Sequence, residues 1–167
     1  MLDLGCGAGL PAMRMIVDSG HAAVGVDVSR EQINRARKNV PEADLILASA
    51  PDLDLPPASF DAVVSFYTID HIPREDHLPL LRSMYGWIRE GGWLLLAVEA
   101  GDEPGVVSEW LGQPMFFSHF DAALTRKLIG DAGFEIVRTQ QETQTEGSRP
   151  VPYQWLLARK PVPDSHP

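Results

Sequence analysis

At the start of the chain stands the stretch Leu2-Asp3-Leu4-Gly5-Cys6-Gly7-Ala8-Gly9-Leu10, in which three glycines at alternate positions follow a short apolar run with one acid. An apolar run before a glycine cluster predicts a buried strand that ends in a tight turn. Glycine tolerates positive φ and lets a ligand approach the bare backbone. The free N–H groups of a following helix favour an anionic group. The stretch therefore predicts a loop that binds a small-molecule cofactor.

The spacing of the glycines narrows the choice of cofactor. The dinucleotide-binding fingerprint is Gly-x-Gly-x-x-Gly or Ala. The sixth position counted from Gly5 is Leu10, so the register of that fingerprint fails. An ordinary strand-to-helix turn is the alternative for this loop taken alone.

The bulk composition is that of a soluble globular chain, since 44% of its 167 residues are hydrophobic and 22% are charged. This length suits one domain. The net charge of −9, with scattered Lys and Arg residues, argues against a nucleic-acid partner, which would need a basic face. No stretch is long and apolar enough to span a bilayer. The single cysteine, Cys6, fits a reducing compartment, so we expect a cytoplasmic protein without a membrane partner.

An acid ends the second predicted strand, Ala22–Val26. Asp27 lies 22 positions after Gly5, where nucleotide-binding α/β proteins hold the ribose hydroxyls. One carboxylate can accept hydrogen bonds from both hydroxyls, so we expect ribose binding here rather than helix capping. Ser29 and Gln32 predict a capping box for a helix over residues 30–40. A third strand is predicted over residues 45–48.

The second informative stretch is Ser59–Tyr67, which contains the buried-strand sequence Phe-Asp-Ala-Val-Val-Ser. Ligands of open parallel sheets bind beyond the carboxyl ends of the strands. Phe66 and Tyr67 are therefore expected at the site, followed closely by His71. A core-facing helix is predicted over residues 78–88 from its apolar spacing.

Two further boundaries follow from proline and glycine. Pro79 is expected to lie in the first turn of this helix or to start it, and Gly91-Gly92 is expected to end it. Trp93–Val98 is continuously apolar and predicts a central buried strand.

Residues 100–120 interrupt the regular alternation of strands and helices and predict a long loop. A loop of this length inside a compact domain is usually functional, often as a lid. Its aromatic and Met side chains would supply adaptable apolar contact area. The alternative is that these side chains only complete the core.

The last third of the chain predicts a helix and a hairpin. Asp121 is expected to cap a helix that runs to Ala132. A strand begins at Phe134, a turn follows at residues 146–148, and a strand returns over Val151–Ala158, so the two strands must be antiparallel. The Pro-rich tail over 161–167 is expected to be disordered.

The glycine loop, Asp27, the fourth strand and the terminal hairpin, in this order, resemble the class I S-adenosylmethionine (SAM)-dependent methyltransferases of the bacterial small-molecule type (methyltransferase type 11/25-like). The resemblance covers Leu2 to about Lys160. It implies an α/β Rossmann-like fold, with a mostly parallel seven-stranded sheet of order 3-2-1-4-5-7-6, an antiparallel C-terminal hairpin and helices on both faces. Members usually carry helices before the glycine loop, so the resemblance implies an N-terminally truncated domain over residues 1–160.

The resemblance implies SAM as cofactor and S-adenosylhomocysteine as product, with no metal. The cofactor-binding residues that we predict are Asp3, Gly5, Cys6, Gly7, Gly9, Asp27, Val28, Gln32, Ser49, Ala50, Phe66 and Tyr67. Members of the family often have an acid where this chain has Ser49. Asp52 and Asp54 are nearby alternatives, although a solvated loop explains both better.

Methyl transfer from a sulfonium is an in-line displacement that depends on alignment in a site freed of water. A hydroxyl or acidic-carbon acceptor also needs a base, and imidazole titrates near neutral pH. We predict His71 and Tyr67 as catalytic residues, with a structural histidine as the alternative for His71. The predicted binding residues for a small, partly hydrophobic acceptor are His71, Trp110, Met115, Phe116, Phe117 and His119, of which His119 is a weaker candidate for the base.

Two other functions stay open at this point. A nucleotide-dependent (NAD-type) oxidoreductase is disfavoured by the glycine register and by the absence of a Tyr-x-x-x-Lys pair. A non-catalytic SAM-binding or interaction module is the other, and a homodimer partner could then cover the cofactor.

Overall fold

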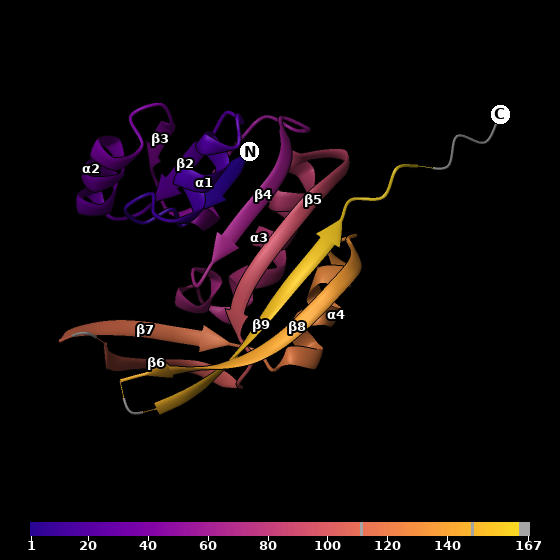
Figure 1. Ribbon diagram of the computed structural model, residues 1–167. Helices are drawn as coiled ribbons and strands as arrows, with labels where there is room; N and C mark the ends of the chain where they lie inside the picture. Colours follow the sequence, from indigo (N-terminus) through magenta and orange to yellow (C-terminus); the bar gives the residue numbers. More distant parts are fainter. Residues whose placement is uncertain (111, 148, 164–167) are drawn as a thin grey trace.

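The computed structural model describes residues 1–110, 112–147 and 149–163. One seven-stranded sheet with the order β3-β2-β1-β4-β5-β9-β8 forms the centre of the molecule (Figure 1). The first five of these strands are parallel, and β9 pairs antiparallel with both β5 and β8. Its strands are β1 (Leu2–Leu4), β2 (Val24–Asp27), β3 (Asp44–Leu47), β4 (Phe60–Phe66), β5 (Ile88–Glu99), β8 (Glu135–Glu146) and β9 (Arg149–Arg159).

The predicted fold is confirmed. The observed order is the predicted 3-2-1-4-5-7-6 when the strands of this sheet alone are numbered, because β6 and β7 form a separate small sheet. The strands alternate their side chains between two apolar layers. In β4, for example, Val63 packs into one layer and Val64 into the other.

Helices cover both faces of the sheet. The helices α1 (Ala12–Asp18) and α2 (Arg30–Asn39) supply Met13, Ile16, Ile33 and Ala36 to one layer. The other layer contains apolar side chains of α3 (Arg74–Trp87) and α4 (Ala122–Asp131). Two short 3-10 helices, η1 (Ala50–Asp52) and η2 (Ile69–His71), follow β3 and β4.

The predicted Asp121 cap is present, but only half of the predicted capping box forms: the Ser29 N–H donates to Asp27 Oδ1 rather than to the Gln32 side chain, whose Oε1 has no described partner. The Ser29 hydroxyl accepts a hydrogen bond from the Gln32 N–H at 3.3 Å. The Asp121 carboxylate accepts from the N–H groups of Ala123 and Leu124 at 2.8 and 2.9 Å. Both caps satisfy backbone donors that the first turn of a helix leaves free.

Both predicted boundaries of the third helix were wrong. α3 begins at Arg74, so Pro79 lies inside it rather than in its first turn. The helix ends at Trp87 because Ile88 already pairs with Phe60 of β4. Gly91 and Gly92 therefore belong to β5. A Cβ at Gly92 would lie 2.7 Å from the Asp61 carbonyl oxygen, so glycine is needed where these strands approach closely.

The predicted long loop was also wrong. Most of residues 100–120 form a two-stranded antiparallel hairpin of β6 (Glu103–Trp110) and β7 (Gln113–His119). The hairpin lies beyond the carboxyl ends of β4 and β5 (Figure 1). Phe117, Ser118 and His119 of β7 are buried, whereas β6 is largely exposed. The pair forms a sheet of its own because β6 and β7 pair with each other and with no strand of the central sheet.

Two expectations about the chain lie partly outside the described residues. Residues 161–163 have no regular secondary structure, but 164–167 of the predicted tail lie outside the described part, as does Ser148 of the predicted turn. Among the described residues, no helix is both long and apolar enough to cross a membrane.

Candidate functional site

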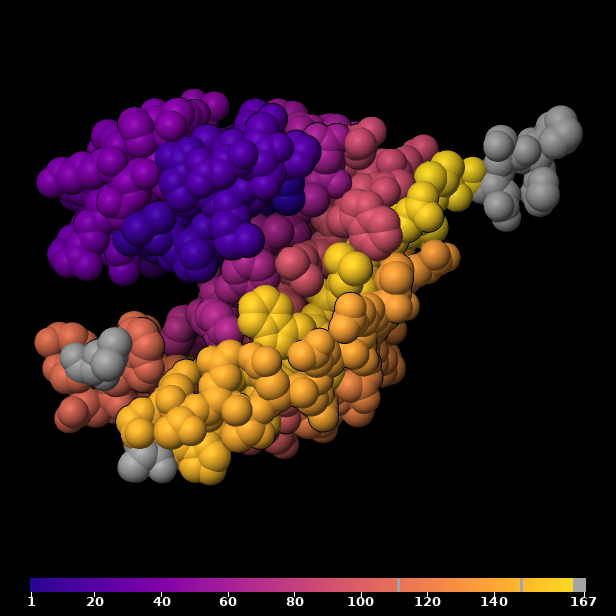
Figure 2. Space-filling model, in the orientation of Figure 1, coloured from indigo at the N-terminus to yellow at the C-terminus, as the bar shows by residue number. Residues whose placement is uncertain are grey.

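The carboxyl ends of β1, β2 and β4 face a hollow. Figure 2 shows it between the N-terminal part of the chain, in indigo and purple, and the β6–β7 hairpin, in salmon. Two clefts open here. One of about 530 Å³ contains residues from the loops after β2, β3 and β4, and one of about 750 Å³ lies along the glycine loop and α1. Gly5, Phe66 and Tyr67 line both clefts, so the clefts meet at the ends of β1 and β4.

The glycine loop needs its glycines for different reasons. Gly5 has φ +79°, and a Cβ there would lie 1.9 Å from the Thr68 hydroxyl, so only glycine lets the loops after β1 and β4 touch. Gly7, at φ +52°, would direct a Cβ into open space. The backbone at Gly7 is therefore bare on the cleft side, as a loop that receives a ligand requires.

Gly9 has a different role from the predicted one. It is buried and lines neither cleft, and a Cβ there would lie 2.9 Å from both Met13 and Val40. The third glycine of the motif thus serves the packing of the loop against α1 and α2 rather than contact with a cofactor.

Asp27 ties the glycine loop to the end of β2. Its Oδ2 accepts a hydrogen bond from the Gly7 N–H at 2.9 Å, and its Oδ1 accepts from the Ser29 N–H at 2.8 Å. Each carboxylate oxygen can accept a second hydrogen bond, so Asp27 can still receive two hydroxyl groups from the 530 Å³ cleft, which it lines.

Four more of the predicted cofactor residues line this cleft. Val28, Gln32, Ser49 and Ala50 line it together with Asp27. Asp52 and Asp54 are not among the lining residues, so the solvated-loop interpretation of these two acids fits the structure.

Asp3 is a buried acid with an unsatisfied oxygen. It is 2% exposed, it lines the 750 Å³ cleft, and no described group donates to its Oδ2. Burial, reinforced by the charge of Asp27, raises the pKa of Asp3 to about 7. A cation in the cleft would supply the missing partner and favour the ionised carboxylate.

Cys6 lies in the same loop but is not activated. Burial, together with the charges of Asp3 and Asp27, raises the pKa of its thiol to about 12. The thiol therefore stays protonated at neutral pH, and Cys6 contributes a small side chain to the cleft wall rather than a nucleophile.

Tyr67 is strained at the junction of the two clefts. Its backbone has φ +57°, a conformation that non-glycine residues rarely adopt and that is typical of functional sites. Its hydroxyl accepts a hydrogen bond from the Gln144 amide at 2.9 Å, and its ring meets Tyr153 edge to face at 4.9 Å. The end of β8–β9 therefore fixes the position of the Tyr67 ring.

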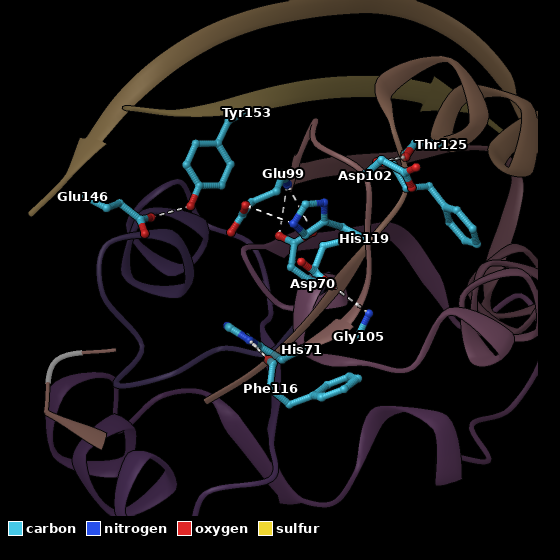
Figure 3. A network of polar contacts seen from close by, with 12 residues as sticks. Asp70, His71, Glu99, Asp102, Gly105, Phe116, His119, Thr125, Glu146 and Tyr153 are labelled. Carbon is cyan, nitrogen blue, oxygen red and sulfur yellow. Dashed lines mark hydrogen bonds and ion pairs between the residues drawn. The ribbon is translucent and has the colours of Figure 1, made fainter. Parts of the chain in front are cut away.

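His71 ends η2 and has one ring nitrogen fixed by the hairpin. Its Nδ1 lies 2.8 Å from the Phe116 carbonyl oxygen, which can only accept, so Nδ1 carries a proton and donates it (Figure 3). In the neutral ring, Nε2 is then the nitrogen with a free lone pair. His71 lines the 530 Å³ cleft and a third, smaller pocket of about 210 Å³.

The hairpin residues divide among several places. Trp110 and Phe117 line the 210 Å³ pocket, and Met115 lines the 530 Å³ cleft. Phe116 lines neither, and its contribution is the carbonyl that holds His71, while its ring packs beside Gly105.

The predicted role of His119 does not fit its position. It is 7% exposed and does not line the 210 Å³ pocket, and its Nε2 lies 3.1 Å from Glu99 Oε2. Burial alone would lower the pKa of His119, but the hydrogen bond to Glu99 and the charges of Glu99 and Asp70 outweigh it and raise the pKa. His119 is thus a buried partner of Glu99, not a base carried by the hairpin.

Five residues of the 210 Å³ pocket were absent from the sequence prediction: Asp70, Glu99, Gln144, Glu146 and Tyr153. Both oxygens of Asp70 accept from the Glu99 N–H at 3.1 Å, and the Tyr153 hydroxyl donates to Glu146 (Figure 3). Glu99 could have been found, since it follows the apolar run of β5 at the carboxyl end of a central strand. The other end of the pocket comes from the curvature of β8 and β9, for which the sequence has no local signal.

The residues of the two larger clefts fit an adenosyl ligand whose amino-acid part carries a cation. Asp27 is placed for two hydroxyls, Gly7 leaves room at the backbone, and the orphaned Asp3 oxygen faces the second cleft. No group of three or more His, Cys, Asp or Glu residues in the described part of the chain is placed to hold a metal ion.

Comparisons with known proteins identify the family. A family model described as a methyltransferase domain matches residues 2–96. The chain is 34% identical over 102 residues to 27-O-demethylrifamycin SV methyltransferase of Amycolatopsis mediterranei, which covers 58% of this chain and 37% of that protein. It is 29% identical over 167 residues to tRNA U34 carboxymethyltransferase of Hahella chejuensis, covering 93% and 51% of the two proteins.

Among solved structures, a SAM-dependent methyltransferase of Methanosarcina mazei superimposes with a TM-score of 0.84 at 19% identity, covering 96% of this chain and 92% of that one. At that identity the likeness shows the fold alone. The chain spans about one third to one half of the length of the first curated relatives that it matches.

Proposed function

Because this chain belongs to the methyltransferase domain family, whose members include class I SAM-dependent enzymes, we propose that it transfers a methyl group from SAM to a small-molecule acceptor. The observation that carries the proposal is the meeting of two clefts at the glycine loop, one with the ribose acid Asp27 and one with the unsatisfied acid Asp3, beside a third pocket at His71. A dinucleotide-dependent oxidoreductase has no support in the family match.

We assign the cofactor to the first two clefts. Asp27 would accept from the ribose hydroxyls, the loop after β3 at Ser49 and Ala50 would border the base, and Asp3 would face the cationic amino-acid part. When bound, SAM supplies an electrophilic methyl group on its sulfonium. The glycine loop and Tyr67 would bring that end of the cofactor towards the 210 Å³ pocket, since Tyr67 lines all three spaces.

The chain's own residues would then bind the acceptor, exclude water and move one proton. The Phe116 carbonyl fixes the His71 ring and its tautomer, so Nε2 is the nitrogen available to take a proton from the acceptor. Trp110 and Phe117 of the hairpin line the pocket with apolar surface, which favours the exclusion of water during the transfer.

The size and charge of the pocket support a small acceptor. Its volume of about 210 Å³ lies below the roughly 300–1,000 Å³ of common ligand pockets. No Lys or Arg is among the described residues that line any of the three spaces. A tRNA substrate, as in the name of one relative, would need basic groups for its phosphates.

The proposal is tested by calorimetric titration of the protein with SAM, S-adenosylhomocysteine and NAD. We expect the two adenosyl ligands to bind and NAD not to bind. Asp27→Ala should weaken adenosyl binding by at least about tenfold, because a hydrogen bond to a charged group is worth roughly 1.5–3 kcal/mol. Asp44→Ala, an exposed acid of β3, is the matched control and should leave binding unchanged. A folded chain that binds neither adenosyl ligand, or NAD alone, would overturn the proposal.

A further inference from the structure

Three carboxylates from different elements line the 210 Å³ pocket beside His71. Asp70 comes from η2, Glu99 from the end of β5 and Glu146 from the end of β8. Their separation along the chain means that only the folded structure brings them together. Like charges that converge on a cavity repel one another, so this arrangement is stabilised when a cation enters it.

One of these carboxylates has an oxygen without a partner. The Glu99 side chain is 6% exposed, and its Oε2 pairs with His119 Nε2 at 3.1 Å. No hydrogen bond from the described residues reaches Oε1. Figure 3 shows this second oxygen turned away from His119, towards the side where Tyr153 and Glu146 lie. Glu99 lines the pocket, so Oε1 is free to accept a hydrogen bond from a donor that enters there.

The walls between the acids are aromatic. Tyr67 and Tyr153 meet edge to face at 4.9 Å, and Trp110 and Phe117 enter from the hairpin. Aromatic faces attract ammonium groups within about 6 Å. The same walls offer apolar contact area to a carbon skeleton attached to the cation.

The positive charges nearby do not neutralise the pocket. Among its described lining residues the only basic side chain is His71, whose Nδ1 donates to Phe116. His119 lies behind Glu99, and Arg74 pairs with Asp102 and with the His119 carbonyl oxygen. Burial raises the pKa of Asp70 to about 7, so this carboxyl is partly protonated at neutral pH. Even without Asp70 and with His119 protonated, the two carboxyl groups of Glu99 and Glu146 outnumber that one cation.

We infer that the methyl acceptor is a small amine that enters this pocket as its ammonium cation, donates a hydrogen bond to Glu99 Oε1 and rests against Tyr67 and Tyr153. The inference deepens the proposed function and rests on it. It assigns Glu99 and Glu146 as specificity-determining residues for a cationic acceptor over a neutral one.

The reaction balances with the groups present. The ammonium loses one proton to His71 Nε2, and the freed nitrogen lone pair forms the new N–C bond to the methyl carbon. The sulfonium C–S bond breaks with its electron pair retained by sulfur, so that the products are a methylated ammonium, a neutral thioether and a protonated His71.

The experiment is an NMR chemical-shift titration of the protein saturated with S-adenosylhomocysteine, with n-butylammonium chloride and 1-butanol as probes of equal length and different charge. We expect the ammonium to bind at least about tenfold more tightly than the alcohol. Glu99→Gln keeps an oxygen that can accept from His119 and should reduce this preference at least about threefold. Glu146→Gln, at a partly exposed position with little risk to folding, should do the same.

Glu135→Gln, an exposed acid at the other end of β8, makes the same change in net charge and should leave the preference unchanged. Equal affinity for the two probes, or an unchanged preference in both Glu99→Gln and Glu146→Gln, would overturn the amine assignment and leave the proposed function standing. Failure of the wild-type protein to bind S-adenosylhomocysteine would overturn both.

Discussion

Replacing Asp3 by Asn should increase the stability of the ligand-free protein relative to the wild type as the pH rises, although the substitution removes a residue of the site. Asp3 is 2% exposed and its Oδ2 has no described partner, and burial followed by the charge of Asp27 raises its pKa from 3.8 to about 7. A carboxyl whose pKa is raised on folding contributes full stability below the pKa of the unfolded chain. That contribution is lost as the pH rises through the folded value.

The magnitude follows from the two pKa values. Each pKa unit corresponds to about 1.4 kcal/mol, so the rise from 3.8 to about 7 costs the folded state roughly 4 kcal/mol above pH 7. At pH 4.5 the folded carboxyl is still protonated whereas the unfolded chain has lost most of this proton, and the cost is about 1 kcal/mol. An Asn side chain does not titrate. The free energy of unfolding of Asp3→Asn minus that of the wild type should therefore increase by about 3 kcal/mol between pH 4.5 and pH 8.

Urea denaturation followed by tryptophan fluorescence at pH 4.5, 6 and 8 measures this difference. The Asn amide brings a penalty of its own for its unpaired N–H groups, but that penalty is the same at every pH. Asp44→Asn, an exposed acid on β3, is the control and should show no such trend. A stability difference for Asp3→Asn that stays constant across the pH range would refute the view that Asp3 is held as an uncompensated buried acid.

Two further predictions follow from single contacts. Gly5→Ala places a Cβ 1.9 Å from the Thr68 hydroxyl at φ +79°, so it should lower the free energy of unfolding by more than about 2 kcal/mol, and a thermal-melt difference under 2 °C would contradict this. His71→Ala should reduce turnover of an identified acceptor by about 10²-fold or more with little change in SAM affinity, because His71 is held by Phe116 towards the acceptor pocket. Unchanged turnover at saturating substrate would exclude His71 as the base.

The predicted site residues that the structure brings together are those with a local physical cause. A strand that runs into glycines, and an acid at the end of the next strand, are short-range patterns, and the structure places Gly5, Gly7 and Asp27 together as expected. The strand order was predicted from the resemblance to a family, because either strand of a C-terminal hairpin could pair with the central sheet.

The parts that failed depend on contacts between distant segments. Gly9 belongs to the same motif as Gly5, but its conformation serves packing against Met13 and Val40. His119 was a candidate base because histidine often has that role. In the structure its Nε2 pairs with the Glu99 carboxylate at the junction of β5 and the hairpin. Nothing within a few residues of His119 indicates that partner.

The energetically unfavourable features of this fold lie at the carboxyl ends of the strands. Tyr67 carries a positive φ, Asp3 has a buried oxygen without a donor, and Glu99 turns an unpaired oxygen into a pocket shared with Asp70 and Glu146. A core free to optimise stability would replace such groups with apolar side chains. Two of these features are relieved by a particular partner: a cation beside Asp3, and a donor beside Glu99. A ligand that supplies either partner binds the folded protein and not the unfolded chain. Cofactor and cationic acceptor should therefore each stabilise the folded protein, with Tyr67 at the boundary between their spaces.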